Sequence, residues 1–252
     1  MSVANTFKDH FSKQAGDYAQ YRPSYPPALF AYLAGLCNKH DAAWDCGTGN
    51  GQAALLLIPY FERVFASDPS AAQIEHAEPH ERIAYRVAAA EASGFPVQSV
   101  DLITVAQAFH WFNFEAFFRE AQRVLRPGGI LAIWCYSLLR IRPDIDSLID
   151  DYYTRIIGPY WPAERRWVDD QYRSVSLPFP EINPPTFAMT ANWRREALFG
   201  YLCTWSARQA YIRERGSDPL NLLLPALREC WPDASQTLPI TWPLHVRVCR
   251  VH

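Results

Sequence analysis

A glycine-rich turn carries the clearest chemical signal in the sequence. The run Asp45-Cys-Gly-Thr-Gly-Asn-Gly51 follows the short apolar stretch Ala42–Trp44 and precedes a helical pattern that begins at Gln52. Glycines let the backbone turn sharply and approach a ligand closely, and the start of the next helix offers N–H donors. The turn, which contains Gly47, Thr48, Gly49 and Gly51, is therefore predicted to bind a ligand.

Two carboxylates indicate which kind of ligand this turn binds. A dinucleotide-binding turn reads Gly-x-Gly-x-x-Gly, whereas here Gly51 comes one residue early and Asp45 stands before the glycines. A carboxylate at this place repels a pyrophosphate but accepts hydrogen bonds from an ammonium group, which favours a cationic ligand without phosphates. Asp68, 17 residues beyond Gly51, ends the next predicted strand, where a carboxylate can bind both hydroxyls of a ribose. Each acid alone could be a helix cap or a turn residue, but the pair favours a ligand site.

The elements that position these residues alternate between short strands and helices. Such alternation predicts a doubly wound α/β fold, with a parallel sheet and helices on both faces. The predicted strands are Ala42–Trp44, Arg63–Ser67, Ile83–Ala88, Val100–Val105 and Ile130–Tyr136. The predicted helices are Leu29–Leu36, Gln52–Ile58, Ser70–Ala77 and Phe114–Val124.

The alternation stops after Tyr136. Helical patches such as Ile145–Ile157, interrupted by prolines, predict an inserted cap. A strand at Pro185–Asn192, helices at Arg194–Arg213 and Pro219–Cys230, and a last strand at Pro243–Val251 are expected to follow. The last strand alternates apolar and polar residues, so it is predicted to be an antiparallel edge strand with one face exposed to solvent.

Composition narrows the range of partners. Of the 252 residues, 49% are hydrophobic, which predicts a globular chain. The 24 Lys and Arg are balanced by 26 Asp and Glu, so the chain lacks the excess of positive charge that is typical of nucleic-acid-binding proteins. No apolar run reaches the length of a membrane-spanning helix, and the first residues do not read as a secretory signal, so we expect a cytoplasmic protein. The six cysteines form no Cys-x-x-Cys pair. His76 and His80 are spaced four residues apart, like two ligands on one face of a helix, but Pro79 places the pair across a helix end, so no metal site is expected.

The motifs together resemble those of class I S-adenosylmethionine-dependent methyltransferases. The resemblance covers about residues 7 to 136 and rests on the glycine turn, Asp68, Ala89-Ala-Glu91, the strand Val100–Ala108 and Arg123-Val-Leu-Arg-Pro-Gly-Gly129. Two further runs, Ala106–Phe112 and Ala15-x-x-Tyr18-x-x-Tyr-Arg-Pro-x-Tyr-Pro26, resemble more narrowly the trans-aconitate methyltransferase group. The resemblance implies a mostly parallel seven-stranded sheet with an antiparallel last strand and a helical cap inserted after strand five.

The same resemblance implies a separate role for each of four segments of the chain. Residues 1–40 would form N-terminal helices that cover the cofactor site, and residues 41–136 would bind S-adenosylmethionine and release S-adenosylhomocysteine. Residues 137–182 would form the cap and bind the acceptor, and residues 183–252 would complete the sheet.

The resemblance also assigns roles to individual residues. The glycine turn would pack against the methionine and ribose portion of the cofactor, with Asp45 near its amino group and Asp68 on the ribose hydroxyls. The adenine edge would lie by Ala90 and Glu91. Relatives often carry an acid where this chain has Ala89, so recognition of the adenine would fall here to backbone groups or to Glu91. The remaining cofactor contacts would come from Ala106, Gln107, Tyr18, Tyr21 and Arg22.

The acceptor is predicted to be a small molecule, with a carboxylate as one candidate. Methyl transfer needs alignment and exclusion of water more than a nucleophilic triad, and a base is needed only where the acceptor must lose a proton. His110 could orient a carboxylate or accept a proton, and Trp111 could wall the pocket; the alternatives are a histidine that holds the loop and a tryptophan that packs in the core. The expected acceptor-binding residues of the cap are Tyr160, Trp161, Arg165, Arg166, Trp167 and Tyr172. An arginine among them would favour a carboxylate, and the sequence leaves open which one.

Two other function classes remain open from the sequence. One is a member of the fold that binds the cofactor without turnover, because a fold does not fix a function. The other is an NAD(P)-dependent oxidoreductase, whose cofactor would occupy the same end of the sheet. The sequence also leaves open whether the chain is a monomer or a homodimer.

Overall fold

The computed structural model describes residues 23–251. The predicted cofactor contacts Tyr18, Tyr21 and Arg22 lie outside the described residues, as does most of the predicted N-terminal unit.

Within the described residues, eight strands form one sheet in the order β3-β2-β1-β4-β5-β8-β6, with β7 also paired to β8. The first five strands are parallel, and β8 runs antiparallel to β5, β6 and β7. The doubly wound, mostly parallel fold is thus confirmed, with one strand more than expected. The strands are β1 (Ala42–Cys46), β2 (Arg63–Asp68), β3 (Ile83–Val87), β4 (Val100–Ala106), β5 (Leu125–Tyr136), β6 (Glu181–Ile182), β7 (Phe187–Trp193) and β8 (Leu238–Arg250).

Helices cover both faces of the sheet because the strands bury both sets of side chains. In β1 every residue is buried: Ala43 faces the core beneath α2 (Pro27–Gly35) and α3 (Gln52–Leu57), whereas Trp44 faces the core beneath α5 (Phe114–Val124). This two-sided burial explains why the parallel strands read as continuous apolar runs. The short helix α4 (Ala71–Glu75) follows β2, with Ser70 as its N-cap, and the 3₁₀ turn η2 (Phe109–Trp111) follows β4.

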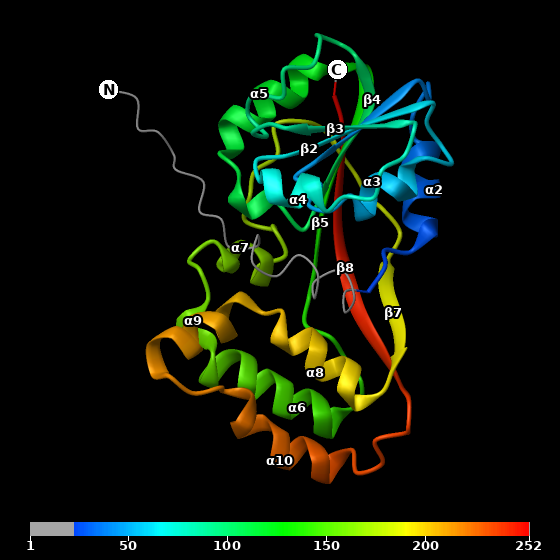
Figure 1. Cartoon of the computed structure of the whole chain (residues 1–252). Helices are drawn as coiled ribbons and strands as arrows, with labels where there is room; N and C mark the ends of the chain where they lie inside the picture. Colours follow the sequence, from blue (N-terminus) through cyan, green and yellow to red (C-terminus); the bar gives the residue numbers. More distant parts are fainter. Residues whose placement is uncertain (1–22, 252) are drawn as a thin grey trace.

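A helical lobe lies below the sheet at the far ends of β5, β7 and β8 (Figure 1). Within it α6 packs against α10, and an aromatic cluster around Trp205 joins it to the sheet core. The lobe draws on both the predicted cap and the predicted C-terminal part. Its elements are α6 (Pro143–Asp151), the π-helical turn η3 (Tyr152–Ile156), the 3₁₀ turn η4 (Gly158–Tyr160), α8 (Arg195–Cys203), α9 (Ser206–Arg215) and α10 (Leu220–Cys230). The short helix α7 (Arg165–Asp169) lies between this lobe and the sheet layer and contacts η2 (Figure 1).

Two predicted elements differ from the structure. The last strand is longer than expected and is not an edge, because β8 pairs with β5 on one side and with β6 and β7 on the other. Alternation along a strand reports which face is buried and says nothing about whether the strand's edges are paired. The single helix expected at Arg194–Arg213 is broken between α8 and α9, where Trp205 turns to extended backbone and buries its ring.

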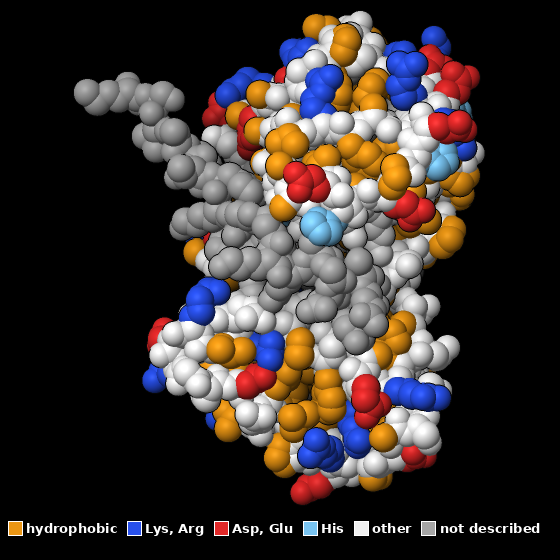
Figure 2. Space-filling model, viewed as in Figure 1, with side chains coloured by type: hydrophobic (Ala, Val, Ile, Leu, Met, Phe, Trp, Pro, Cys, Tyr) orange, Lys and Arg blue, Asp and Glu red, His pale blue; other side chains and the backbone are white. Residues whose placement is uncertain are grey.

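The surface of the described part is mixed in charge. On the face drawn in Figure 2, cationic and anionic side chains are interspersed over both the sheet layer and the helical lobe. None of the described helices is long and apolar enough to cross a bilayer. Residues 23–251 contain no cluster of three or more His, Cys, Asp or Glu side chains arranged to bind a metal.

Candidate functional site

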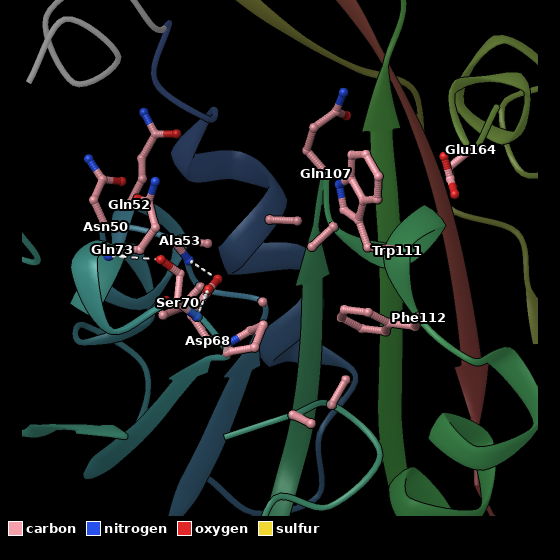
Figure 3. Close-up of a pocket in the computed structure, with 18 of the residues that line it drawn as sticks. Asn50, Gln52, Ala53, Asp68, Ser70, Gln73, Gln107, Trp111, Phe112 and Glu164 are labelled. Atoms are coloured by element: carbon pink, nitrogen blue, oxygen red, sulfur yellow. Dashed lines mark hydrogen bonds between the residues drawn. The ribbon is translucent and has the colours of Figure 1, made fainter. Parts of the chain in front are cut away.

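A cavity of about 590 Å³, here called the main cavity, opens at the carboxyl ends of the parallel strands. One wall comes from the loop after β1, the end of β2 and α4, with Asn50, Asp68 and Gln73, and the opposite wall comes from the segment after β4, with Gln107 and Trp111 (Figure 3). The volume is within the range of pockets that hold small molecules and cofactors, and the position is where open α/β sheets bind ligands.

Most amide groups of the glycine turn are already hydrogen-bonded within the protein. The N–H groups of Gly47 and Thr48 both donate to the Ser67 carbonyl, at 2.8 and 3.0 Å, and the Gly51 N–H donates to the Thr48 carbonyl at 3.0 Å. The Gly49 N–H donates to Asp68 Oδ2 at 3.0 Å. A turn that cradles phosphates presents these amides to the ligand, so this turn does not fit a dinucleotide pyrophosphate.

Close packing requires glycine at two places in the turn. Gly47 and Gly51 have φ values of +70° and +89°, and a Cβ would lie 2.5 Å from Ala108 Cβ at Gly47 and 2.3 Å from the Tyr85 hydroxyl at Gly51. Gly47 lines the main cavity, whereas Gly51 does not. Gly51 therefore serves the turn by letting β3 approach it.

Asp45 lies beneath the turn and does not line the cavity. It is fully buried, and its two carboxylate oxygens accept hydrogen bonds from the hydroxyls of Thr48, at 2.5 Å, and Thr104, at 2.8 Å. Burial raises the pKa of Asp45 to about 6, although both hydroxyls oppose the shift. Asp45 thus reaches the cavity only through Thr48, which does line it.

The main cavity is acidic. Asp68, Glu91 and Glu164 line it, and no Lys or Arg is among its described lining residues. The Asp68 carboxylate is fixed at the end of β2, because Oδ2 accepts from Gly49 N and Oδ1 accepts from Ser70 N at 2.9 Å. A cavity of this charge fits a cationic ligand without phosphates.

The segment after β3 reaches the cavity with Ala89, Ala90 and Glu91. Glu91 also has a structural role, because its Oε1 accepts the Asn113 N–H at 2.7 Å, and Asn113 in turn caps α5. One oxygen of Glu91 is therefore already used, and the other remains for a ligand.

Gln107 directly follows β4 in a left-handed conformation, with φ at +54°. Its N–H donates to the Trp134 carbonyl at 2.9 Å, and its side-chain oxygen accepts the Tyr136 N–H at 3.0 Å. Because the oxygen must face that N–H, the side-chain NH₂ group is left with no hydrogen bond to a described residue. Strained backbone held in this way is typical of functional sites.

A second cavity of about 60 Å³, here called the side cavity, adjoins the main cavity. The two share Gln107, Trp111 and Tyr136. Beyond these the side cavity is walled by residues of the cap and of α8 and α9, namely Trp161, Arg165, Tyr201 and Trp205, together with His110. The shared residues mark the junction where a ligand of one cavity would meet a ligand of the other.

His110 is buried in the wall of the side cavity. Its Nδ1 lies 2.9 Å from the hydroxyl of Tyr172, a residue whose own backbone is left-handed with φ at +58°. Burial, together with the nearby charge of Arg165, lowers the pKa of His110 to about 3, so the imidazole is neutral at physiological pH. Burial also raises the pKa of Tyr172 well above its usual range, so the phenol keeps its proton.

The structure separates the predicted site residues into three groups. The main cavity is lined by Gly47, Thr48, Gly49, Asp68, Ala90, Glu91, Ala106, Gln107 and Trp111, and the side cavity by Gln107, His110 and Trp111. Asp45 and Gly51 line neither cavity, and Tyr18, Tyr21 and Arg22 are not described. Of the expected cap residues, Trp161 and Arg165 line the side cavity, Tyr172 holds His110, and Arg166 stacks on Trp167 away from both cavities.

Several lining residues were not predicted from the sequence. They are Asn50, Gln52, Ser70, Gln73, Tyr136, Glu164, Tyr201 and Trp205. The first four adjoin the glycine turn or Asp68, so their nearness in the sequence was a usable signal. Tyr201 and Trp205 carry no such signal, because the helical lobe brings them to His110 from about 90 residues away.

Comparisons with known proteins identify the family of this chain. A family model described as a methyltransferase domain matches residues 44–133. A protein of Dictyostelium discoideum that is named a methyltransferase is 37% identical over 235 residues, which cover 92% of this chain and 88% of the relative. A protein of Saccharomyces cerevisiae, named as an S-adenosylmethionine-dependent methyltransferase, is 24% identical and matches 94% of this chain and 95% of its own length.

A solved structure is also similar. A type II methyltransferase, as it is described, from Anaeromyxobacter dehalogenans matches with a TM-score of 0.87 and 43% identity, covering 92% of this chain and 100% of that chain. These similarities decide against the oxidoreductase alternative, in agreement with a turn whose amides are already bonded to β2. S-adenosylmethionine is the cofactor of the family, and the acidic main cavity fits it, since its sulfonium and ammonium groups are cations and it carries no phosphate. The chain belongs to the class I S-adenosylmethionine-dependent methyltransferases.

Proposed function

We propose that this chain methylates the carboxylate of a small molecule held in the side cavity. The observation that carries the proposal is the neutral, buried His110 beside the junction of the two cavities. A base with a pKa of about 3 cannot take a proton efficiently from a phenol or an ammonium group at neutral pH, whereas a carboxylate arrives already ionised.

His110 acts in this proposal as a hydrogen-bond donor. The Tyr172 hydroxyl stays protonated and donates a hydrogen bond to Nδ1, which leaves the imidazole proton on Nε2. The Nε2–H group then orients one oxygen of the acceptor, and the side-chain NH₂ of Gln107 is a second donor at the junction. Trp111 and Tyr136 exclude water there, which leaves the carboxylate less solvated and more reactive.

The residues of the main cavity hold the cofactor. Asp68 accepts hydrogen bonds from the ribose hydroxyls, and Asp45 acts through Thr48 by fixing the turn formed by Gly47, Thr48 and Gly49. Ala90 and Glu91 border the adenine, and Ala106 and Gln107 border the end nearest the acceptor. When bound, S-adenosylmethionine supplies an electrophilic methyl group and leaves as S-adenosylhomocysteine, while the acceptor carboxylate becomes a methyl ester.

An acceptor panel tests this proposal. Purified protein is incubated with S-adenosylmethionine carrying a deuterated methyl group and with carboxylic acids, phenols and amines, and the products are identified by mass spectrometry before and after mild alkali. The expected product is a labelled, alkali-labile ester of one or more acids. Labelled phenol ethers or methylamines without esters would refute carboxylate methylation, and binding of the cofactor without any product would favour the non-catalytic alternative.

A further inference from the structure

A single cation faces the side cavity. Arg165 is the only charged side chain among the described residues that line it. The arginine side chain is 19% exposed, so it is largely withdrawn from water. A guanidinium in such a place attracts an anion more strongly than one on the open surface does.

The guanidinium of Arg165 is held by its neighbours through one edge and one face. Its Nε donates to the Tyr153 hydroxyl at 2.7 Å and lies 3.4 Å from Asp169 Oδ1. Its central carbon lies 4.7 Å from the centre of the Trp161 ring and 5.3 Å from that of Tyr153. These contacts fix the plane of the group before any ligand binds.

The terminal amino groups of Arg165 remain available. Neither Nη1 nor Nη2 makes a hydrogen bond to a described residue. The ion pair with Asp169 uses only Nε at a long distance, and the Asp169 side chain is half exposed, so it does not neutralise the guanidinium fully. Two parallel N–H donors of this kind match the two oxygens of a carboxylate.

The rest of the side cavity is aromatic. Trp111, Tyr136, Trp161, Tyr201 and Trp205 contribute to its walls. The indole Nε1 of Trp161 is buried without a partner among the described residues. Walls of this kind suit a small, flat, apolar body that carries an anionic group.

We propose that Arg165 binds the acceptor's carboxylate and restricts the enzyme to small acids with a flat, apolar body. This inference rests on the proposed function, because it takes the ligand of the side cavity to be the acceptor. It also identifies Arg165, out of the two neighbouring arginines in the cap, as the residue that determines specificity.

Binding without turnover tests the proposal first. The protein saturated with S-adenosylhomocysteine is titrated with acetate, benzoate and trans-cinnamate, and with the neutral amides of these acids, by calorimetry. We expect the wild type to bind at least one of the aromatic acids more tightly than acetate and to bind the matching amide about 30-fold more weakly, as expected for loss of charge-assisted hydrogen bonds. Equal affinity for acid and amide, or no binding of any acid, would overturn the proposal.

Three variants then assign the effect to the side chain. Arg165→Met should weaken acid binding about 30-fold and leave amide binding nearly unchanged. Arg165→Lys should retain only part of the affinity, because lysine keeps the positive charge but lacks the paired N–H donors of the guanidinium. Arg166→Met is the matched control, because Arg166 is exposed, stacks on Trp167 and lines neither cavity. Unchanged binding of S-adenosylhomocysteine by each variant shows that the fold is intact. Acid affinity that is equal in Arg165→Met and Arg166→Met would rule out Arg165 as the anchor.

Kinetics separates this inference from the proposed function. With an acid that the wild type esterifies, Arg165→Met should raise KM about 30-fold and change kcat far less. Esterification with an unchanged KM would leave the proposed function standing and refute the role of Arg165. Acid binding that depends on Arg165, but with no ester formed by the wild type, would refute the proposed function alone.

Discussion

The Nδ1 atom of His110 lies 2.9 Å from the hydroxyl oxygen of Tyr172, and both side chains are buried, His110 in the wall of the side cavity. The contact joins the segment after β4 to the cap, 62 residues apart in the chain. It fixes the orientation of a neutral imidazole, which in this position is suited to donate a hydrogen bond and poorly suited to remove a proton.

Replacement of His110 should therefore reduce turnover without loss of the cofactor. His110→Ala removes the donor that orients the acceptor, so we expect kcat/KM to fall by about 10- to 100-fold, the range of one positioned polar group. The affinity for S-adenosylhomocysteine, measured by calorimetry, should change less than threefold. Tyr172→Phe, which keeps the ring and removes the hydroxyl, should give a smaller loss. Full activity of His110→Ala would make His110 a purely structural residue.

The depressed pKa of His110 also predicts a dependence of stability on pH. The unfolded chain takes up a proton on this histidine below about pH 6.5, whereas the folded chain does not until about pH 3, so stability falls as pH decreases through this window. Between pH 7 and pH 5 the wild type should lose about 2 kcal/mol more unfolding free energy than His110→Gln. Urea unfolding of both proteins at the two pH values measures this difference. Equal losses would mean that the buried imidazole is protonated in the folded state.

Asp68 is predicted to be the main polar anchor of the cofactor. Asp68→Ala should weaken binding of S-adenosylhomocysteine by about 2–3 kcal/mol, because the bonds from a ribose to a carboxylate are charge-assisted and the Gly49 amide also loses its acceptor. Asp68→Asn, which keeps one acceptor oxygen, should lose less. Glu75→Ala is the control, since Glu75 is exposed on α4 and lines neither cavity. An Asp68→Ala variant that binds as tightly as the Glu75→Ala control would remove Asp68 from the site.

Gly51 should tolerate substitution less well than Gly49. An added Cβ at Gly51 would lie 2.3 Å from the Tyr85 hydroxyl, whereas at Gly49 its nearest neighbour is Gln73 Oε1 at 3.7 Å, and both glycines have positive φ. Gly49→Ala should cost about 1 kcal/mol from the backbone alone, and Gly51→Ala about 2–4 kcal/mol with the added clash. Thermal and urea unfolding compare the two variants. Tyr85→Phe should restore part of the loss in Gly51→Ala, and equal losses at the two glycines would show that Tyr85 yields without cost.

Much of the sheet could be predicted from the sequence because its signals are local. A buried parallel strand is a short apolar run, and the glycine turn follows one such run directly, so β1 to β5 and the position of the main cavity followed from nearby residues. The pairing of β8 could not be predicted in this way, because it depends on β6 and β7, which lie more than 40 residues earlier in the chain.

The chemistry of the site was harder to predict because it depends on contacts between distant segments. Asp45 is engaged by Thr104, 59 residues away, which turns an expected ligand contact into a support for the turn. The left-handed backbone of Gln107 has no signature in its residue type. The side cavity exists only because the broken helix at Trp205 meets the cap residues Trp161 and Arg165 and the loop residue His110.

The dependence of kcat on pH tests the central claim most directly, namely that the acceptor is an ionised carboxylate oriented by a neutral His110. With an acid identified in the acceptor panel, kcat should change less than about twofold between pH 6 and pH 9, because neither a carboxylate nor an imidazole with a pKa of about 3 titrates there. A rise of about tenfold per pH unit below a single pKa in this range, absent from His110→Gln, would show that His110 removes a proton and would contradict the account.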